Sequence, residues 1–225
     1  MRTVRMEAAA VQALEDRLHN IGPVVDALAA CTGRVVISGI GKSAIIAQKI
    51  VATLNSTGTP SLFLHAADAI HGDLGLVQKD DVVMIISKSG ESPEIKVLVP
   101  LIKNFGNCVI GMVGNTTSYL ARRADFVLDT TVAQEACPNN LAPTTSTTAQ
   151  LVMGDVLAVC LMEHRGFRAE DFAKLHPGGT LGKKLYLRVH DLCDDNAAPE
   201  VSPDADLKKV IREMTRARLG LTAVV

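Results

Sequence analysis

The chain has 225 residues, of which 48% are hydrophobic and 21% charged, a composition typical of a globular protein with one large domain and an appended segment. Its 23 basic and 24 acidic residues give a formal net charge of −1, which argues against nucleic acid or an anionic membrane as a partner. The five cysteines show no metal-ligand spacing, and we find no signal peptide and no unbroken apolar stretch of membrane-spanning length, so a cytoplasmic protein with reduced thiols is expected.

The first part of the chain predicts an amphipathic helical stretch from about Val4 to Ala30, broken into two helices at Gly22-Pro23. Apolar runs then alternate with helical patterns. The predicted strands are residues 34–38, 61–64, 82–87, 108–113 and 126–129, and the helices between them are residues 43–56, 92–105 and 118–124. This alternation predicts an α/β fold, a three-layer αβα sandwich with a five-stranded parallel sheet.

Two glycine- and serine-bearing turns each directly follow a buried strand. Residues 38–43 read Ser-Gly-Ile-Gly-Lys-Ser, and residues 87–92 read Ser-Lys-Ser-Gly-Glu-Ser. Ligands of doubly wound sheets bind beyond the carboxyl ends of the strands. Hydroxyls, glycines and a helix N-terminus at that edge favour a phosphate.

The common nucleotide motifs do not fit these turns. The spacing of Gly39, Gly41 and Ala44 matches the dinucleotide fingerprint loosely, but the next strand ends in His65 where an acid would hold the ribose. A nucleotide triphosphatase loop would need glycine at Val36. The sequence therefore indicates a small phosphorylated metabolite.

The last third of the chain begins with a long helical pattern. Residues 144–165 predict a buried apolar helix, in which the hydroxyl-rich start at residues 144–148 caps the helix and faces the pocket. Residues 194–206 are polar and proline-bearing, as in a linker, residues 207–218 predict a helix, and residues 221–225 the start of a strand. We expect the chain to be cut inside a second domain.

Three charged residues are candidates for chemistry. Lys42 begins a helix, where a cation opposes the helix dipole. A functional role therefore explains a lysine at this position better than simple exposure to solvent. Glu94 lies in a first helical turn, where capping alone would account for it. Small and apolar neighbours of Glu135 are expected to raise its pKa and suit it to proton abstraction, although a loop carboxylate paired with a lysine is an equally good interpretation.

Three histidines complete the candidate set. His65 and His71 follow the second predicted strand and are best interpreted as hydrogen-bonding groups, since two ligands make a weak metal site. His176 opens a Pro-Gly-Gly turn. Two acids, a lysine and a histidine beside a phosphate suit aldose–ketose isomerisation, which needs a base, a ring-opening acid and a group that stabilises an enediolate, but no metal or redox cofactor.

The chain resembles the SIS (sugar isomerase) domain arabinose 5-phosphate isomerases. The resemblance extends to about Arg188 and rests on both serine turns together with residues 56–60, 71–75, 135–138, 141–148 and 176–179. Members interconvert D-arabinose 5-phosphate and D-ribulose 5-phosphate, the first step towards 3-deoxy-D-manno-octulosonate. Lys88 departs from the Asn commonly seen there, and it adds positive charge near the phosphate.

The resemblance also implies site residues, domains and assembly. The catalytic set would be Lys42, Glu94, Glu135 and His176. The substrate-binding residues would be Ser43, Gly58, Thr59, His65, His71, Ser87, Ser89, Ser92, Thr131 and Ala133, and His65 would be the position of an inhibitory zinc. No cofactor is required. A homotetramer with sites shared between subunits is implied, as are an SIS domain over residues 1–188 and a linker with the beginning of a CBS module over residues 189–225.

Two alternatives stay open. One is an SIS isomerase acting on a different ketose phosphate. The other is a sugar-phosphate sensor without catalysis, although such sensors often carry a DNA-binding domain for which this chain has no room, and a sensor needs no acid–base set.

Overall fold

The computed structural model describes residues 1–179, 182–183, 198–218 and 220–225. They fall into two units, Met1–Leu175 and His176–Val225, each of which is described by itself. The domain boundary predicted after residue 188 lies outside the described residues.

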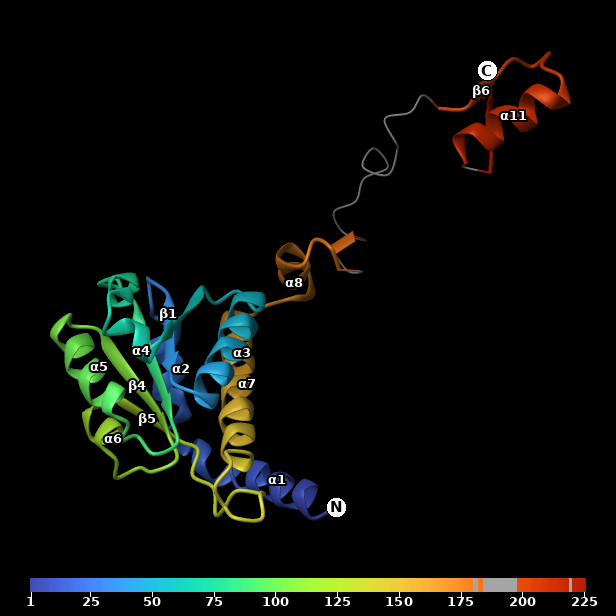
Figure 1. Cartoon of the computed structure of the whole chain (residues 1–225). Coiled ribbons are helices and arrows are strands. Elements are labelled where there is room, and N and C mark those ends of the chain that lie inside the picture. Colours follow the sequence, from blue (N-terminus) through green and yellow to red (C-terminus); the bar gives the residue numbers. More distant parts are fainter. Residues whose placement is uncertain (180–181, 184–197, 219) are drawn as a thin grey trace. The chain divides into compact units, whose positions relative to one another are not determined.

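The first unit is built on a parallel sheet with strand order β2-β1-β3-β4-β5 (Figure 1). Its strands are β1 (Val35–Gly39), β2 (Ser61–His65), β3 (Val82–Ser87), β4 (Cys108–Val113) and β5 (Phe126–Asp129). Gly39 at the end of β1 lies opposite His65 of β2 on one side and Ile86 of β3 on the other. The chain therefore reverses its direction of winding between β1 and β3, and the crevice at such a switch point is where open α/β sheets bind ligands.

Helices cover both faces of this sheet, as the sandwich prediction required. The helical elements are α1 (Arg2–Gln12), η1 (Glu15–Asn20), α2 (Ile21–Ala29), α3 (Lys42–Ser56), α4 (Ala66–Ala69), η2 (Asp73–Leu76), α5 (Pro93–Asn104), α6 (Tyr119–Arg123), α7 (Thr145–Arg165) and α8 (Ala169–Leu175). Figure 1 shows α3 and α7 on one side of the sheet and α5 and α6 on the other.

The side chains of each strand alternate between two cores. Val35 and Ile37 of β1 pack into a core shared with α2, α3 and α7, whereas Val36 packs into the core shared with α5 and α6. All three side chains are buried. Because successive strand residues face opposite sides of a sheet, an unbroken apolar run is what a strand covered on both faces requires.

The N-terminal helices differ from the prediction in where they divide. The break lies in the turn and 3-10 segment between α1 and α2, not at Gly22-Pro23. Pro23 is the third residue of α2, and its missing N–H costs little there because the first-turn N–H groups have no partner within a helix.

Helix α7 is long and apolar enough, by length and composition alone, to cross a membrane, and half of its apolar window is buried in this fold. Buried residues such as Met153 and Leu157 belong to the core beneath the sheet. Packing inside the protein therefore accounts for its composition, as a buried helix requires.

The second unit contains a short strand–helix–strand arrangement. Its strands β6 (Glu200–Val201) and β7 (Ala223–Val224) pair in parallel, and α11 (Leu207–Ala217) lies between them in sequence. The Asp206 side chain accepts a hydrogen bond from the Lys209 N–H and caps α11. The predicted C-terminal strand therefore has its partner earlier in the chain, and the assignment of this unit to a CBS module stays a prediction.

Candidate active site

A pocket of about 300 Å³ opens at the carboxyl ends of β1 and β3, where the winding of the sheet reverses. Both serine turns and the start of α7 contribute to it. Its lining residues are Ile40, Lys42, Ser43, Ile86, Ser87, Lys88, Ser89, Ser92, Pro143, Ser146 and Thr147. The structure thus brings five of the predicted site residues into one pocket, namely Lys42, Ser43, Ser87, Ser89 and Ser92.

The second serine turn is held in shape by its own backbone and side chains. The Ser87 hydroxyl accepts a hydrogen bond of 3.0 Å from the Gly90 N–H. Gly90 has a φ of +65°, and a Cβ there would lie 2.1 Å from the Ser118 hydroxyl oxygen, so the turn requires glycine at this position. Ser92 is the N-cap residue of α5, and Pro93 occupies the first helical position, where proline is favoured.

The pocket attracts anions. Lys42 is the first residue of α3, which begins after Gly41 in a conformation with a φ of +59°. Lys88 adds a second ammonium group, and the N-termini of α3, α5 and α7 all contribute residues to the lining or its edge. Lysines, hydroxyls and helix N-termini are the groups that bind phosphate in proteins.

Glu135 lies directly behind this pocket, fully buried, in the segment between β5 and α7. One carboxylate oxygen accepts hydrogen bonds from the Thr144 and Ser146 N–H groups, at 2.8 and 3.2 Å. The other oxygen accepts the Ser146 hydroxyl at 2.5 Å and pairs with the Lys88 ammonium at 2.6 Å. Glu135 therefore caps α7, whereas Thr144, the predicted cap, makes no side-chain cap hydrogen bond.

These contacts reverse the sequence-based expectation for the pKa of Glu135. Burial by itself raises the pKa of this carboxyl, but hydrogen bonds from Lys88, Ser146 and Thr144 outweigh it and lower the pKa from 4.5 to about 2. The apolar neighbours in sequence suggested a raised value, so that expectation was wrong. The alternative interpretation, a loop carboxylate paired with a lysine, is the arrangement found.

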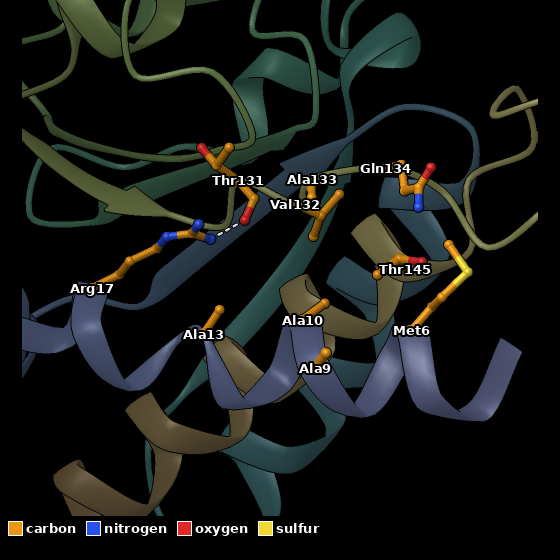
Figure 2. Close-up of a pocket in the computed structure, with 10 residues that line it drawn as sticks. All are labelled: Met6, Ala9, Ala10, Ala13, Arg17, Thr131, Val132, Ala133, Gln134 and Thr145. Carbon is orange, nitrogen blue, oxygen red and sulfur yellow. Dashed lines mark hydrogen bonds between the residues drawn. The ribbon is translucent and has the colours of Figure 1, made fainter. Parts of the chain in front are cut away.

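Glu94 and two further predicted residues do not line the pocket. Glu94 is the acidic residue in the first turn of α5, next to the Ser92 cap. Thr131 and Ala133 line a separate cavity of about 230 Å³ under α1, where the Ala9 and Ala10 side chains face them (Figure 2). In this cavity Arg17 donates a hydrogen bond to the Thr131 carbonyl.

His65 and His71 come at and after the carboxyl end of β2, at the same edge of the sheet as the pocket, but they do not line it. His65 is the last residue of β2, and its Nδ1 atom lies 3.6 Å from an Asp68 carboxylate oxygen. His71 is exposed. Within the described residues no three His, Cys, Asp or Glu side chains gather as metal ligands, so His65 with Asp68 falls short of the donor set that zinc takes in proteins.

Gly58 and Thr59 lie away from the pocket. They follow the C-terminal end of α3 and precede β2, while the pocket is at the N-terminal end of α3. Arg165, at the end of α7, donates hydrogen bonds to the Gly58 carbonyl and the Thr59 hydroxyl, at 3.1 and 2.6 Å. One subunit therefore does not bring these two residues to the pocket.

His176 is the first residue of the second unit, so its position relative to the pocket is not defined. Its assignment to the catalytic set stays a prediction.

Two contacts at the candidate site were missed by the sequence analysis. Lys88 was placed near the phosphate but not against Glu135, and Gln150 was not considered, although it accepts a hydrogen bond of 3.2 Å from the Ser43 hydroxyl. The spacing of residues in α7 could have indicated Gln150 as a site residue. It follows Ser146, which lines the pocket, by four residues, and residues four apart lie on the same side of a helix.

Comparison with known proteins identifies the family of this chain. The model of the SIS domain family matches residues 28–160. The curated arabinose 5-phosphate isomerase KdsD of Pseudomonas aeruginosa is 50% identical over 226 residues, a match that covers 100% of this chain and 69% of that protein. Arabinose 5-phosphate isomerase KpsF of Escherichia coli is 46% identical over 225 residues, covering 99% of this chain and 68% of that protein. This chain therefore spans about two thirds of the length of these relatives.

A solved structure shows the same fold with a sugar phosphate. It is an Escherichia coli protein in complex with arabinose 5-phosphate, it superposes with a TM-score of 0.76 at 43% identity, and the match covers 78% of this chain and 94% of that one. The family match, the identities and the sheet with its switch-point pocket all agree. The chain belongs to the SIS domain family and, within it, to the arabinose 5-phosphate isomerases.

Proposed function

We propose that this protein is an isomerase that interconverts D-arabinose 5-phosphate and D-ribulose 5-phosphate through an enediol(ate), the first step of 3-deoxy-D-manno-octulosonate biosynthesis. The observation that carries the proposal is a hydroxyl- and lysine-lined pocket with a buried carboxylate behind it, in a chain 50% identical to a curated arabinose 5-phosphate isomerase. We infer that the enzyme works in the cytoplasm as a homotetramer without a cofactor. Inhibitory zinc at His65 would need ligands in addition to Asp68, since the described residues supply no third donor.

In the proposed mechanism the serine turn binds the phosphate. The hydroxyls of Ser87, Ser89 and Ser92 line the pocket and would donate hydrogen bonds to phosphate oxygens, together with N–H groups of the turn that the sugar phosphate reaches. Lys42 lines the same pocket and would stabilise the negative charge that develops on the enediolate oxygen. Such groups accelerate the reaction because they are fixed before the charge appears.

Proton transfer is assigned to the remaining three residues. Glu135 would move the proton between carbons 1 and 2, Glu94 would help to reprotonate the enediolate, and His176 would assist ring opening. The Glu135 carboxylate does not line the pocket, but it contacts Ser146 and Lys88, which do. Direct proton transfer would require the carboxylate to come within hydrogen-bond reach of the sugar, so the side chains of Ser146 or Lys88 would have to move when the sugar binds.

A substrate panel tests the reaction. The purified protein is assayed against pentose, hexose and heptose phosphates, and arabinose 5-phosphate is expected to give ribulose 5-phosphate. Turnover of a hexulose or heptulose phosphate alone would assign the chain to another isomerase activity. Binding of sugar phosphate without any turnover would indicate a sensor.

The Glu135→Gln variant tests the assigned base. We expect it to lower kcat by about 10²–10⁴-fold with little change in KM, because the amide cannot take the proton but leaves the phosphate contacts in place. Steady-state kinetics measures both constants. Glu163→Gln, an exposed glutamate at the far end of α7, is the matched control and should retain wild-type rates. An unchanged kcat in Glu135→Gln would remove Glu135 from this role.

A further inference from the structure

The ion pair between Lys88 and Glu135 joins the phosphate pocket to the proposed base. The Lys88 Nζ atom lies 2.6 Å from a Glu135 carboxylate oxygen. The Lys88 side chain is 45% exposed and lines the pocket, while the Glu135 side chain is 0% exposed. One end of this pair is therefore within reach of a bound anion, and the other is not.

Glu135 does not depend on Lys88 for its position. The N–H and hydroxyl groups of Thr144 and of Ser146 all donate hydrogen bonds to the carboxylate. Among the contacts described for Glu135, Lys88 is the one charged group. Removal of the ammonium would thus leave the carboxylate in place and change chiefly its charge environment.

The backbone of Lys88 is fixed, but its ammonium group is at the end of a long stem. The Lys88 carbonyl accepts a hydrogen bond of 3.0 Å from the Gly114 N–H, and a Cβ on Gly114 would lie 2.9 Å from that carbonyl oxygen. The four-carbon stem is flexible and the ammonium group has three donors, so this group can reach more than one acceptor. A phosphate dianion in the pocket would compete directly with the carboxylate for this cation.

We propose that Lys88 responds to phosphate and acts through Glu135: it pairs with Glu135 in the empty pocket and turns to the phosphate of the substrate, leaving the Glu135 carboxylate free for proton transfer. The proposal rests on the isomerase function given above. It assigns to one lysine the coupling between phosphate binding and base catalysis.

The protonation chemistry of Glu135 explains why such coupling is needed. Burial raises the pKa of Glu135, but hydrogen bonds, the strongest of them from Lys88, outweigh burial and lower the pKa to about 2. A carboxylate with so low a pKa is a poor base for a carbon-bound proton, because general bases work best with a pKa near the operating pH. When the Lys88 ammonium leaves Glu135 and binds the phosphate of the sugar, the pKa of Glu135 would rise.

Crystal structures of the wild-type protein with and without inorganic phosphate test the movement directly. Without phosphate, the Lys88 ammonium should lie within about 3 Å of the Glu135 carboxylate. With phosphate in the pocket, it should lie within about 3 Å of a phosphate oxygen and have left the carboxylate. An ammonium that stays on Glu135, or a phosphate that binds away from this pocket, would overturn the proposal.

Kinetics of Lys88→Met separates this role from a merely structural one. We expect KM for arabinose 5-phosphate and Ki for inorganic phosphate to rise together by about 10- to 100-fold, the effect of losing a charged hydrogen bond to the ligand, with kcat changed by less than about threefold. Lys88→Arg should recover most of the phosphate affinity. The matched control Lys79→Met, at an exposed position that precedes β3, should behave as wild type.

The opposite pattern identifies a structural lysine. A fall in kcat with Ki for phosphate unchanged would contradict the proposal, as would a loss of thermal stability without a change in Ki. If Lys88→Met does not fold, the two wild-type crystal structures decide. A protein that shows the lysine movement on binding phosphate but no turnover of arabinose 5-phosphate would retain this inference and lose the proposed function.

Discussion

At the scale of single residues, Glu135 shows how partners distant in the chain determine the chemistry of a side chain. Its neighbours in sequence are small, and they suggested a carboxyl with a raised pKa. In the fold, donors from residues 144–146 and the cation of Lys88 converge on it, and against the opposing effect of burial its pKa falls to about 2. The sequence showed the hydroxyl-rich segment, but not that its donors bind the Glu135 carboxylate.

The low pKa of Glu135 makes a prediction about stability and pH. The folded-state pKa of about 2 lies below the ordinary value of 4.5, so the ionised carboxylate stabilises the fold fully above about pH 4.5 and the effect is lost as the pH falls towards 2. Glu135→Gln should therefore lower the free energy of unfolding by about 1–3 kcal/mol at neutral pH, because an amide N–H₂ would meet backbone and hydroxyl donors. Urea unfolding measures this difference.

The pH dependence distinguishes this cause from a packing defect. The difference between wild type and Glu135→Gln should shrink as the pH is lowered from about 4.5 towards about 2. The control Glu163→Gln, at an exposed position, should stay close to wild type at every pH. A difference for Glu135→Gln that stays constant down to the lowest pH would contradict an origin in the carboxylate charge.

Most of the pocket was predictable from residue types, because hydroxyls and glycines directly after buried strands meet at one edge of a parallel sheet. Lys42, Ser87 and Ser89 reached the pocket for this reason. Gly58 and Thr59 did not, because they precede a strand and so lie at the other edge. They entered the prediction through the family resemblance alone.

At the scale of elements, the strands were predicted within about one residue, since strands covered on both faces by helices are mostly apolar runs in the sequence. The ends of β3, β4 and β5 match the predicted ranges. The short elements α4 and η2 were missed. A single turn of helix is too short for its apolar residues to repeat at a recognisable helical spacing.

The contact between α3 and α7 makes a prediction about packing. A Cβ on Gly154 of α7 would lie 2.4 Å from two carbon atoms of the Ile50 side chain, which is fully buried in α3. Gly154→Ala should therefore destabilise the protein by about 1–3 kcal/mol through overpacking, although alanine favours a helix. Urea unfolding at neutral pH gives the value.

A double-mutant cycle identifies the cause. Ile50→Ala alone should cost about 2–5 kcal/mol, but together with Gly154→Ala the loss should be smaller than the sum of the single losses, because the new methyl group occupies part of the cavity. Gly22→Ala in α2 is the control, since its Cβ would meet no atom within 4 Å. Strict additivity would mean that the two side chains do not compete for space.

At the scale of the whole molecule, the proposed catalytic set is divided between two units. Lys42, Glu94 and Glu135 belong to the first unit, and His176 is the first residue of the second. The first unit by itself therefore carries the phosphate turn and three of the four assigned residues. If another subunit supplies His176 to the site, the proposed homotetramer would be required for catalysis.

Mixing two inactive variants tests such a shared site. Glu135→Gln and His176→Ala should each be nearly inactive alone. After subunit exchange at equal amounts, a site that takes Glu135 from one subunit and His176 from another should be intact in about a quarter of cases, so activity should return to about a quarter of wild type. Mixing without exchange, followed by size-exclusion chromatography, is the control and should restore nothing. If both residues of a site come from the same subunit, exchange also restores nothing, because every site then carries one of the two substitutions.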